Sequence, residues 1–169
     1  MEITTVNQII AAGAGLTGAL VGASISGFVN YRLEHSKRNY ESKALLAGFV
    51  GEVTALRDII IFRGYYTTLS DMLNWEVINK GGSAPFRVNL PKNYARFFDA
   101  NLGKIGMLPH DKLKKLMQFH QIIFAIAQDF NTDSELYQLG FHKEAIEQTV
   151  SGLGAALQLA DEIAKWEVK

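Results

Sequence analysis

The chain has 169 residues, of which 48% are hydrophobic, and it carries 17 basic and 17 acidic side chains, so its formal net charge is zero. A protein whose main partner is nucleic acid usually carries a basic field, and this balance disfavours that class. The absence of cysteine excludes disulfides, thiolate metal sites and cysteine nucleophiles.

The first thirty residues contain a long stretch without charge. No charged side chain lies between Glu2 and Arg32. As a helix rising about 1.5 Å per residue, IIAAGAGLTGALVGASISGFVNY (9–31) is long enough to cross a hydrocarbon layer of about 30 Å. We therefore predict that residues 1–31 form a short tail and a transmembrane helix. The alternatives are a cleaved signal peptide, which basic residues would precede, and a buried helix of a globular protein.

Basic residues follow this stretch and none precedes it. Arg32, Lys37, Arg38 and Lys43 come directly after residue 31. Positive charge stays on the cytoplasmic side of a membrane. This asymmetry predicts a single-pass protein of the bacterial inner membrane, with the lipid bilayer as a partner, the amino terminus outside and residues 32–169 in the cytoplasm.

Small residues recur at every fourth position of the same stretch, in two rows that lie side by side on a helix. Such rows let helices approach closely and favour self-association in lipid. The predicted oligomerisation residues are Ala11, Ala14, Gly15, Gly18, Ala19, Gly22, Ala23, Ser26 and Gly27. The simpler alternative is that glycine and alanine only fill a weakly hydrophobic anchor. Thr17, Ser24 and Asn30 are candidates for lining a pore, although hydroxyl groups also bond to their own helix.

The remaining residues show helical periodicity. The apolar stripe through Leu45, Phe49, Val53 and Ile60 belongs to a helix that continues the first one, since no Gly or Pro lies between residues 30 and 48. Further helices are expected over 69–78, 91–103, 108–131 and 141–166, with a loop at 81–91. No strand signal occurs. The predicted fold is all-α: a transmembrane helix (1–31) followed by an antiparallel cytoplasmic helical bundle (32–169).

No catalytic motif is present. The chain lacks a phosphate-binding glycine loop, a zinc-binding HExxH helix and a nucleophile elbow, so we expect no enzyme activity, cofactor or metal. His35, His110, His120 and His142 fit no metal-ligand spacing.

Two polar residues are expected near the core. His120 lies on an apolar helix face, where a hydrogen-bonded core histidine is the simplest interpretation. Glu52 lies close to a buried face and would need a partner, for which Arg57, Arg96 or Lys104 are the candidates. The alternative for Glu52 is an exposed edge position.

Two segments carry a resemblance to known groups. FFDANLGKIGMLP (97–109) and GEVTALRD (51–58) resemble segments of uncharacterised bacterial and phage-borne proteins with one amino-terminal span and a helical cytoplasmic domain. The overall architecture is similar to the membrane proteins that accompany RNA-targeting type VI CRISPR systems, which implies an oligomeric pore with a helical domain related to HEPN ribonucleases. Arg32 and His35 are too close together to match the Arg and His of those ribonucleases, so ribonuclease activity is not expected.

Two functions follow as hypotheses. The first is a membrane protein that self-assembles through its small-residue helix and perturbs or permeabilises the membrane in antiviral defence. The second is a membrane-tethered adaptor in which the span is only an anchor. In that case the helical domain binds a cytoplasmic protein partner, and the loop 81–91 matters more than the span.

Overall fold

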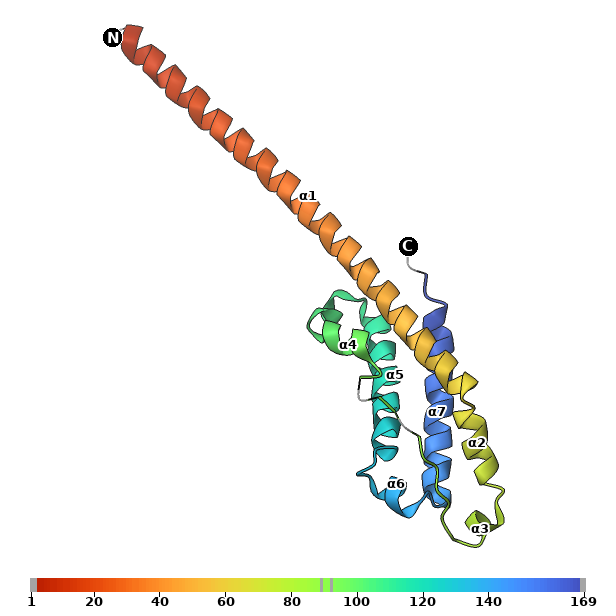
Figure 1. The fold of residues 1–169 in the computed structure, drawn as a ribbon. Coiled ribbons are helices and arrows are strands. Elements are labelled where there is room, and N and C mark those ends of the chain that lie inside the picture. Colours follow the sequence, from red (N-terminus) through yellow and green to blue (C-terminus); the bar gives the residue numbers. More distant parts are fainter. Residues whose placement is uncertain (1–2, 89, 92, 168–169) are drawn as a thin grey trace. The chain divides into compact units, whose positions relative to one another are not determined.

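The computed structural model describes residues 3–88, 90–91 and 93–167, and in the first helix it describes the side chains of Gly15 and of residues from 18 onward. The described residues form seven α-helices and one 3-10 helix and contain no β-strand, so the prediction of an all-α fold is confirmed (Figure 1). The elements are α1 (Ile3–Phe62), α2 (Tyr65–Met72), α3 (Glu76–Asn79), α4 (Arg96–Asn101), the 3-10 helix η1 (Leu102–Met107), α5 (His110–Asp129), α6 (Glu135–Leu139) and α7 (Lys143–Ala164).

The chain divides into two compact units, residues 1–42 and residues 43–169. Helix α1 contributes to both units, and the division falls between Ser42 and Lys43 rather than after residue 31. Each unit is described by itself below.

Helix α1 runs without a break from Ile3 to Phe62. Its continuity through residues 31–47 follows from the absence of glycine and proline there. Gly64 ends it by adopting the left-handed conformation, with φ of 63°, which glycine reaches at little cost. The prediction that the amino-terminal helix continues past residue 31 is therefore confirmed.

The predicted transmembrane helix is not supported. Among the residues that the structure describes, no helix is long and apolar enough to cross a membrane. The prediction of a single-pass inner-membrane protein, amino terminus outside and carboxy-terminal domain cytoplasmic, is therefore wrong. It relied on the length of the uncharged stretch. The side chains of residues 9–14, 16 and 17 of the predicted span lie outside the described residues. In the described part the uncharged run covers residues 18–31, and at about 1.5 Å per residue it is shorter than a hydrocarbon layer of about 30 Å.

The core of unit 43–169 lies among α1, α2, α5 and α7. Helices α5 and α7 lie side by side and run in opposite directions, joined through the short α6, and α2 packs against α7 (Figure 1). The largest fully buried side chains include Phe49 of α1, Phe119 of α5 and Ile146 of α7. One apolar face of each helix thus meets the others, as expected for a helical bundle.

An extended segment leads from α3 to α4 and is held at its start. The backbone groups of Ala84 and Phe141 exchange two hydrogen bonds, 3.1 and 2.8 Å long, and the Ser83 hydroxyl donates to the Leu139 carbonyl. Gly140 allows this approach, because a Cβ there would lie 3.1 Å from the Ala84 carbonyl oxygen. These contacts join residues distant in sequence and anchor the segment that leads to α4.

Candidate functional site

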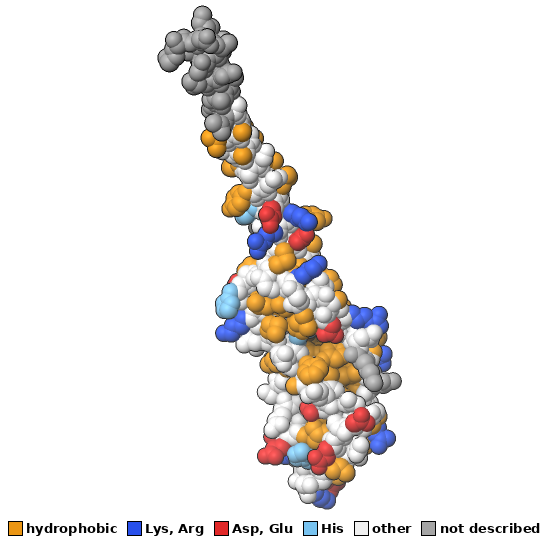
Figure 2. Space-filling model, turned by 90° about the vertical axis from the view of Figure 1, so that its left-hand side faces the viewer, with side chains coloured by type: hydrophobic (Ala, Val, Ile, Leu, Met, Phe, Trp, Pro, Cys, Tyr) orange, Lys and Arg blue, Asp and Glu red, His pale blue; other side chains and the backbone are white. Residues whose placement is uncertain are grey.

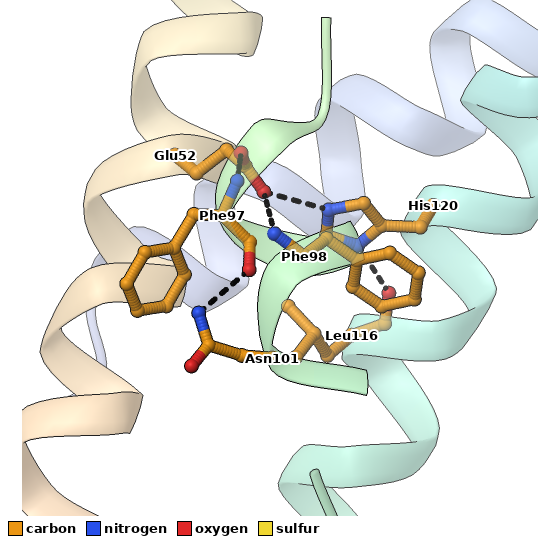
Figure 3. Close-up of polar contacts among 6 residues, drawn as sticks. All are labelled: Glu52, Phe97, Phe98, Asn101, Leu116 and His120. Atoms are coloured by element: carbon orange, nitrogen blue, oxygen red, sulfur yellow. Dashed lines mark hydrogen bonds and ion pairs between the residues drawn. The ribbon is translucent and has the colours of Figure 1, made fainter. Parts of the chain in front are cut away.

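A buried carboxylate from α1 occupies the start of α4. The first backbone N–H groups of a helix have no acceptor within the helix. Ala95, which precedes α4, has only a methyl group and cannot accept a hydrogen bond from them. Glu52 accepts two of these groups: Phe97 N–H donates to Oε1 at 2.6 Å and Phe98 N–H to Oε2 at 3.0 Å (Figure 3). The carboxylate therefore fixes α4 against α1 with two charge-assisted hydrogen bonds.

His120 of α5 completes this polar cluster. Its side chain is only 4% exposed, and that of Glu52 is 11% exposed. Nδ1 lies 2.9 Å from the Leu116 carbonyl oxygen, which can only accept, so Nδ1 carries the hydrogen. Nε2 lies 3.3 Å from Oε2 of Glu52 (Figure 3). We call Glu52, His120 and the two N–H groups the Glu52–His120 cluster.

The protonation of the cluster depends on opposing effects. The Nε2 contact with Oε2 is a hydrogen bond only when one proton lies between the two atoms. Burial is the largest influence and lowers the pKa of His120, whereas the Leu116 carbonyl and the carboxylates of Glu52 and Asp99 act to raise that pKa. Because desolvation prevails, the neutral imidazole is the favoured form at neutral pH.

Aromatic rings enclose the cluster. The Phe98 ring is stacked on the His120 imidazole with centroids 3.8 Å apart and planes 12° from parallel. Phe97 meets Phe49 edge to face at 5.0 Å. The Asn101 side chain donates to the Phe97 carbonyl at 2.8 Å and steadies the last turn of α4 (Figure 3). These contacts hold the imidazole and carboxylate in one arrangement.

A cavity of about 260 Å³ opens beside the imidazole. Its wall combines aromatic rings with a carboxylate, a phenol and an amide. The six side chains that matter below are Tyr94, Phe98, Asp99, His120, Gln121 and Phe124. Burial raises the pKa of Tyr94, and the nearby Asp99 carboxylate adds to that rise. The Tyr94 hydroxyl therefore keeps its proton.

The two polar residues singled out from the sequence, Glu52 and His120, are neighbours, although they are 68 positions apart. The partners of Glu52 are an imidazole and two backbone groups, where the sequence had pointed to Arg57, Arg96 or Lys104. Arg57 is paired with Asp58. What sequence reasoning missed is the lack of a capping side chain at residue 95, which marks α4 as a helix that needs an acceptor from elsewhere.

The predicted oligomerisation residues that the structure describes lie on the surface of α1. A Cβ added at Gly15, Gly18, Gly22 or Gly27 would meet nothing within 4 Å. Ala19, Ala23 and Ser26 are exposed as well, while the side chains of Ala11 and Ala14 lie outside the described residues.

The three residues considered for a pore have different outcomes. The side chain of Thr17 lies outside the described residues, and Asn30 is exposed. The Ser24 hydroxyl donates to the Leu20 carbonyl at 2.8 Å, so its own helix takes up its hydrogen. With the membrane span unsupported, the pore interpretation is not supported either.

Large apolar side chains accompany the small ones on this part of α1. Each of these residues is between 47% and 68% exposed. They are Leu20, Val21, Ile25, Phe28, Val29, Tyr31 and Leu33. Figure 2 shows hydrophobic side chains on the surface of this part of the helix. We call Gly15 and residues 18–33 of α1 the exposed apolar segment.

Comparisons with protein-family models, with curated proteins and with solved structures found no match. Among the described residues, no group of three or more histidine, aspartate or glutamate side chains is placed to hold a metal ion.

Proposed function

We propose that this protein is a non-enzymatic, self-assembling protein in which the exposed apolar segment of one copy packs against the same segment of others. The observation that carries the proposal is the exposure of seven large apolar side chains on one stretch of helix. Full burial of such a side chain contributes about 1.5–3 kcal/mol relative to exposure. Contiguous apolar surface of this kind is typical of interaction sites.

The chemistry of the segment favours a second copy of the same chain as its partner. Residues 15–31 carry no charge, which disfavours a charged partner surface. Gly18 and Gly22 have open space around them, so another helix can approach the backbone there. The distance between packed helices depends on the side chains at the contact, and the same segment of another copy offers both small residues for close approach and apolar ones for burial.

The charged residues that follow are compatible with side-by-side assembly. Residues 32–43 carry both basic and acidic side chains, including the pair Lys37–Glu41 on successive turns. Mixed charge limits repulsion between copies. Assembly through the exposed apolar segment would display several copies of unit 43–169 together.

The test is the mass of the full-length protein as a function of concentration, measured by light scattering after size separation. We expect a discrete oligomer that dissociates on dilution. In the variant Gly18→Leu/Gly22→Leu, bulky side chains fill the close-approach positions and should weaken association by about tenfold or more, since 1.4 kcal/mol corresponds to a factor of ten.

Gly51→Leu is the matched control. Gly51 lies on the same helix and also has nothing within 4 Å of an added Cβ, but it is outside the exposed apolar segment. Both changes replace a helical glycine by a better helix former, so neither should weaken the isolated helix. A wild-type protein that stays monomeric, or a double variant that assembles as well as Gly51→Leu, would contradict the proposal. A monomer would leave the adaptor hypothesis, in which the helical domain binds a different protein.

A further inference from the structure

The cavity beside the Glu52–His120 cluster has the chemistry of a ligand site. From its wall we infer that it binds a small organic cation carrying an ammonium or guanidinium group, with the Asp99 carboxylate as counter-charge. The inference is independent of self-assembly, because every wall residue belongs to unit 43–169.

Three polar side chains at the cavity have no hydrogen-bond or ion-pair partner among the described residues. Among the described residues, the side chains of Tyr94, Asp99 and Gln121 make no hydrogen bond or ion pair with one another or with the rest of the chain. They come from two elements, Tyr94 and Asp99 from around α4 and Gln121 from α5, yet all three border the same cavity. Together they offer a carboxylate, a phenol oxygen and an amide oxygen to a donor.

Several groups that could donate to an anion are already occupied. Nδ1 of His120 donates to the Leu116 carbonyl, and Nε2, which carries no hydrogen in the neutral ring, faces Oε2 of Glu52. The Phe97 and Phe98 N–H groups donate to Glu52 (Figure 3). The Tyr94 hydroxyl and the Gln121 amide can still donate, but neither carries a charge. Asp99 is the one carboxylate in the wall, and the carboxylate of Glu52 lies directly behind the imidazole. The local field therefore favours a cation over an anion.

Aromatic rings supply the rest of the recognition. Tyr94, Phe98 and Phe124 border the cavity, and one face of the Phe98 ring is covered by His120. Phe124 is 52% exposed, so its ring is accessible to a ligand in the cavity. A cation over an aromatic face is attracted by the negative charge of that face, and the attraction is stronger when water is excluded.

The size of the cavity limits the ligand. Pockets for drug-sized molecules measure roughly 300–1,000 Å³, and about 260 Å³ suits a smaller compound. The raised pKa of Tyr94 keeps its hydroxyl neutral, so it can accept from the cation through its oxygen and donate to Asp99.

Calorimetric titration of the full-length chain tests the inference with four probes that each carry a short alkyl chain and differ in their polar group. The probes are n-butylguanidine, n-butylamine, n-butanol and butyrate. We expect the two cations to bind in competition with each other, and butanol and butyrate to bind at least about tenfold more weakly, the scale of a charge-assisted contact. Tighter binding of butyrate or butanol, or no binding of either cation, would overturn the inference.

Substitutions in the cavity wall test whether the cation binds in this cavity. Asp99→Asn should weaken n-butylguanidine about tenfold, and Phe124→Leu about threefold through loss of the ring face. Both side chains are exposed, so the fold should persist, as a thermal melt would verify. Asp71→Asn, at an exposed acid on α2, is the matched control and should bind like the wild type. Equal weakening by Asp71→Asn and Asp99→Asn would overturn the assignment.

Two further titrations are needed. The first distinguishes an arginine side chain from a free compound as the cation, and the second distinguishes a failure of cation binding from a failure of self-assembly. A capped Gly-Arg-Gly peptide that binds more tightly than n-butylguanidine would identify the natural ligand as an arginine side chain, and weaker binding would identify it as a free compound. Titration of the Gly18→Leu/Gly22→Leu variant should give the wild-type affinity whether or not that variant assembles. A failure of self-assembly and a failure of cation binding are thus distinguishable.

Discussion

The two halves of α1 differ in how much of their apolar surface the chain itself covers. In residues 45–60 most apolar side chains pack against the bundle, and Phe49 and Val53 are fully buried, while Ile59 is 50% exposed. In residues 18–33 the apolar side chains are just as large, but about half or more of each is exposed. Helical periodicity alone does not distinguish an apolar face that packs within the chain from one that the chain leaves exposed.

The space around the glycines also differs between the two halves of α1. A Cβ added at Gly48 would lie 2.0 Å from the ring of Phe97, whereas Cβ atoms added at Gly15, Gly18, Gly22 and Gly27 would meet nothing. In the bundle, glycine makes room for a ring that is already there. In the exposed apolar segment, glycine leaves room that nothing in the described chain fills.

The largest expected effect comes from truncating one phenylalanine in each half. Phe49→Ala removes a fully buried ring and should lower the free energy of unfolding by about 3–5 kcal/mol. Phe28→Ala removes a ring that is 60% exposed and should change that free energy by no more than about 0.5 kcal/mol. Urea titration of both variants, followed by circular dichroism, gives the two values. Equal losses in a sample dilute enough to be monomeric would mean that Phe28 is buried within the chain, and the contrast between the halves would fail.

Alanine at two glycines of α1 should have opposite effects. Gly48→Ala places a methyl group against the Phe97 ring and should destabilise the protein by about 1–3 kcal/mol. Gly51→Ala enters open space on the same helix and should stabilise it by about 1 kcal/mol through helix propensity. Thermal unfolding measured side by side checks the sign of each change. A stabilising Gly48→Ala would show that Phe97 moves aside easily and that α4 is loosely held.

The sequence predicted the helices better than their partners. The continuity of α1, the all-α class and the apolar faces of α5 and α7 follow from local periodicity and from the positions of glycine and proline. The break of the predicted helix 69–78 into α2 and α3, and the short α6, were missed because elements of four to eight residues carry little periodic signal.

The candidate site depends on contacts that no local pattern encodes. Glu52 and His120 each looked unusual in sequence, but their pairing requires α1, α4 and α5 to meet. The membrane prediction failed for a related reason. Absence of charge predicts a span only where it extends over about twenty residues, and among the described side chains it extends over residues 18–31 before Arg32 and Glu34 follow.

The smallest expected effect is on the pH dependence of stability, and its sign tests the electrostatics of the Glu52–His120 cluster. Burial lowers the pKa of His120 below its unfolded value of about 6.5. As pH falls through about 6.5, the unfolded chain gains a proton that the folded chain resists, so the folded state loses stability. Glu52 and Asp99 oppose this effect by favouring the imidazolium.

We therefore expect the free energy of unfolding to fall between pH 7.5 and pH 5.5. The fall should be smaller in His120→Gln and unchanged in His142→Gln, which alters an exposed histidine at the start of α7. Denaturant titrations at four pH values measure the slope, so a lower overall stability of His120→Gln does not affect the comparison. A wild-type protein that becomes more stable on acidification, with that gain lost in His120→Gln, would show that the two carboxylates outweigh burial. Nε2 would then carry the proton that bridges it to Glu52, and His120 would join α1 to α5 as one half of an ion pair.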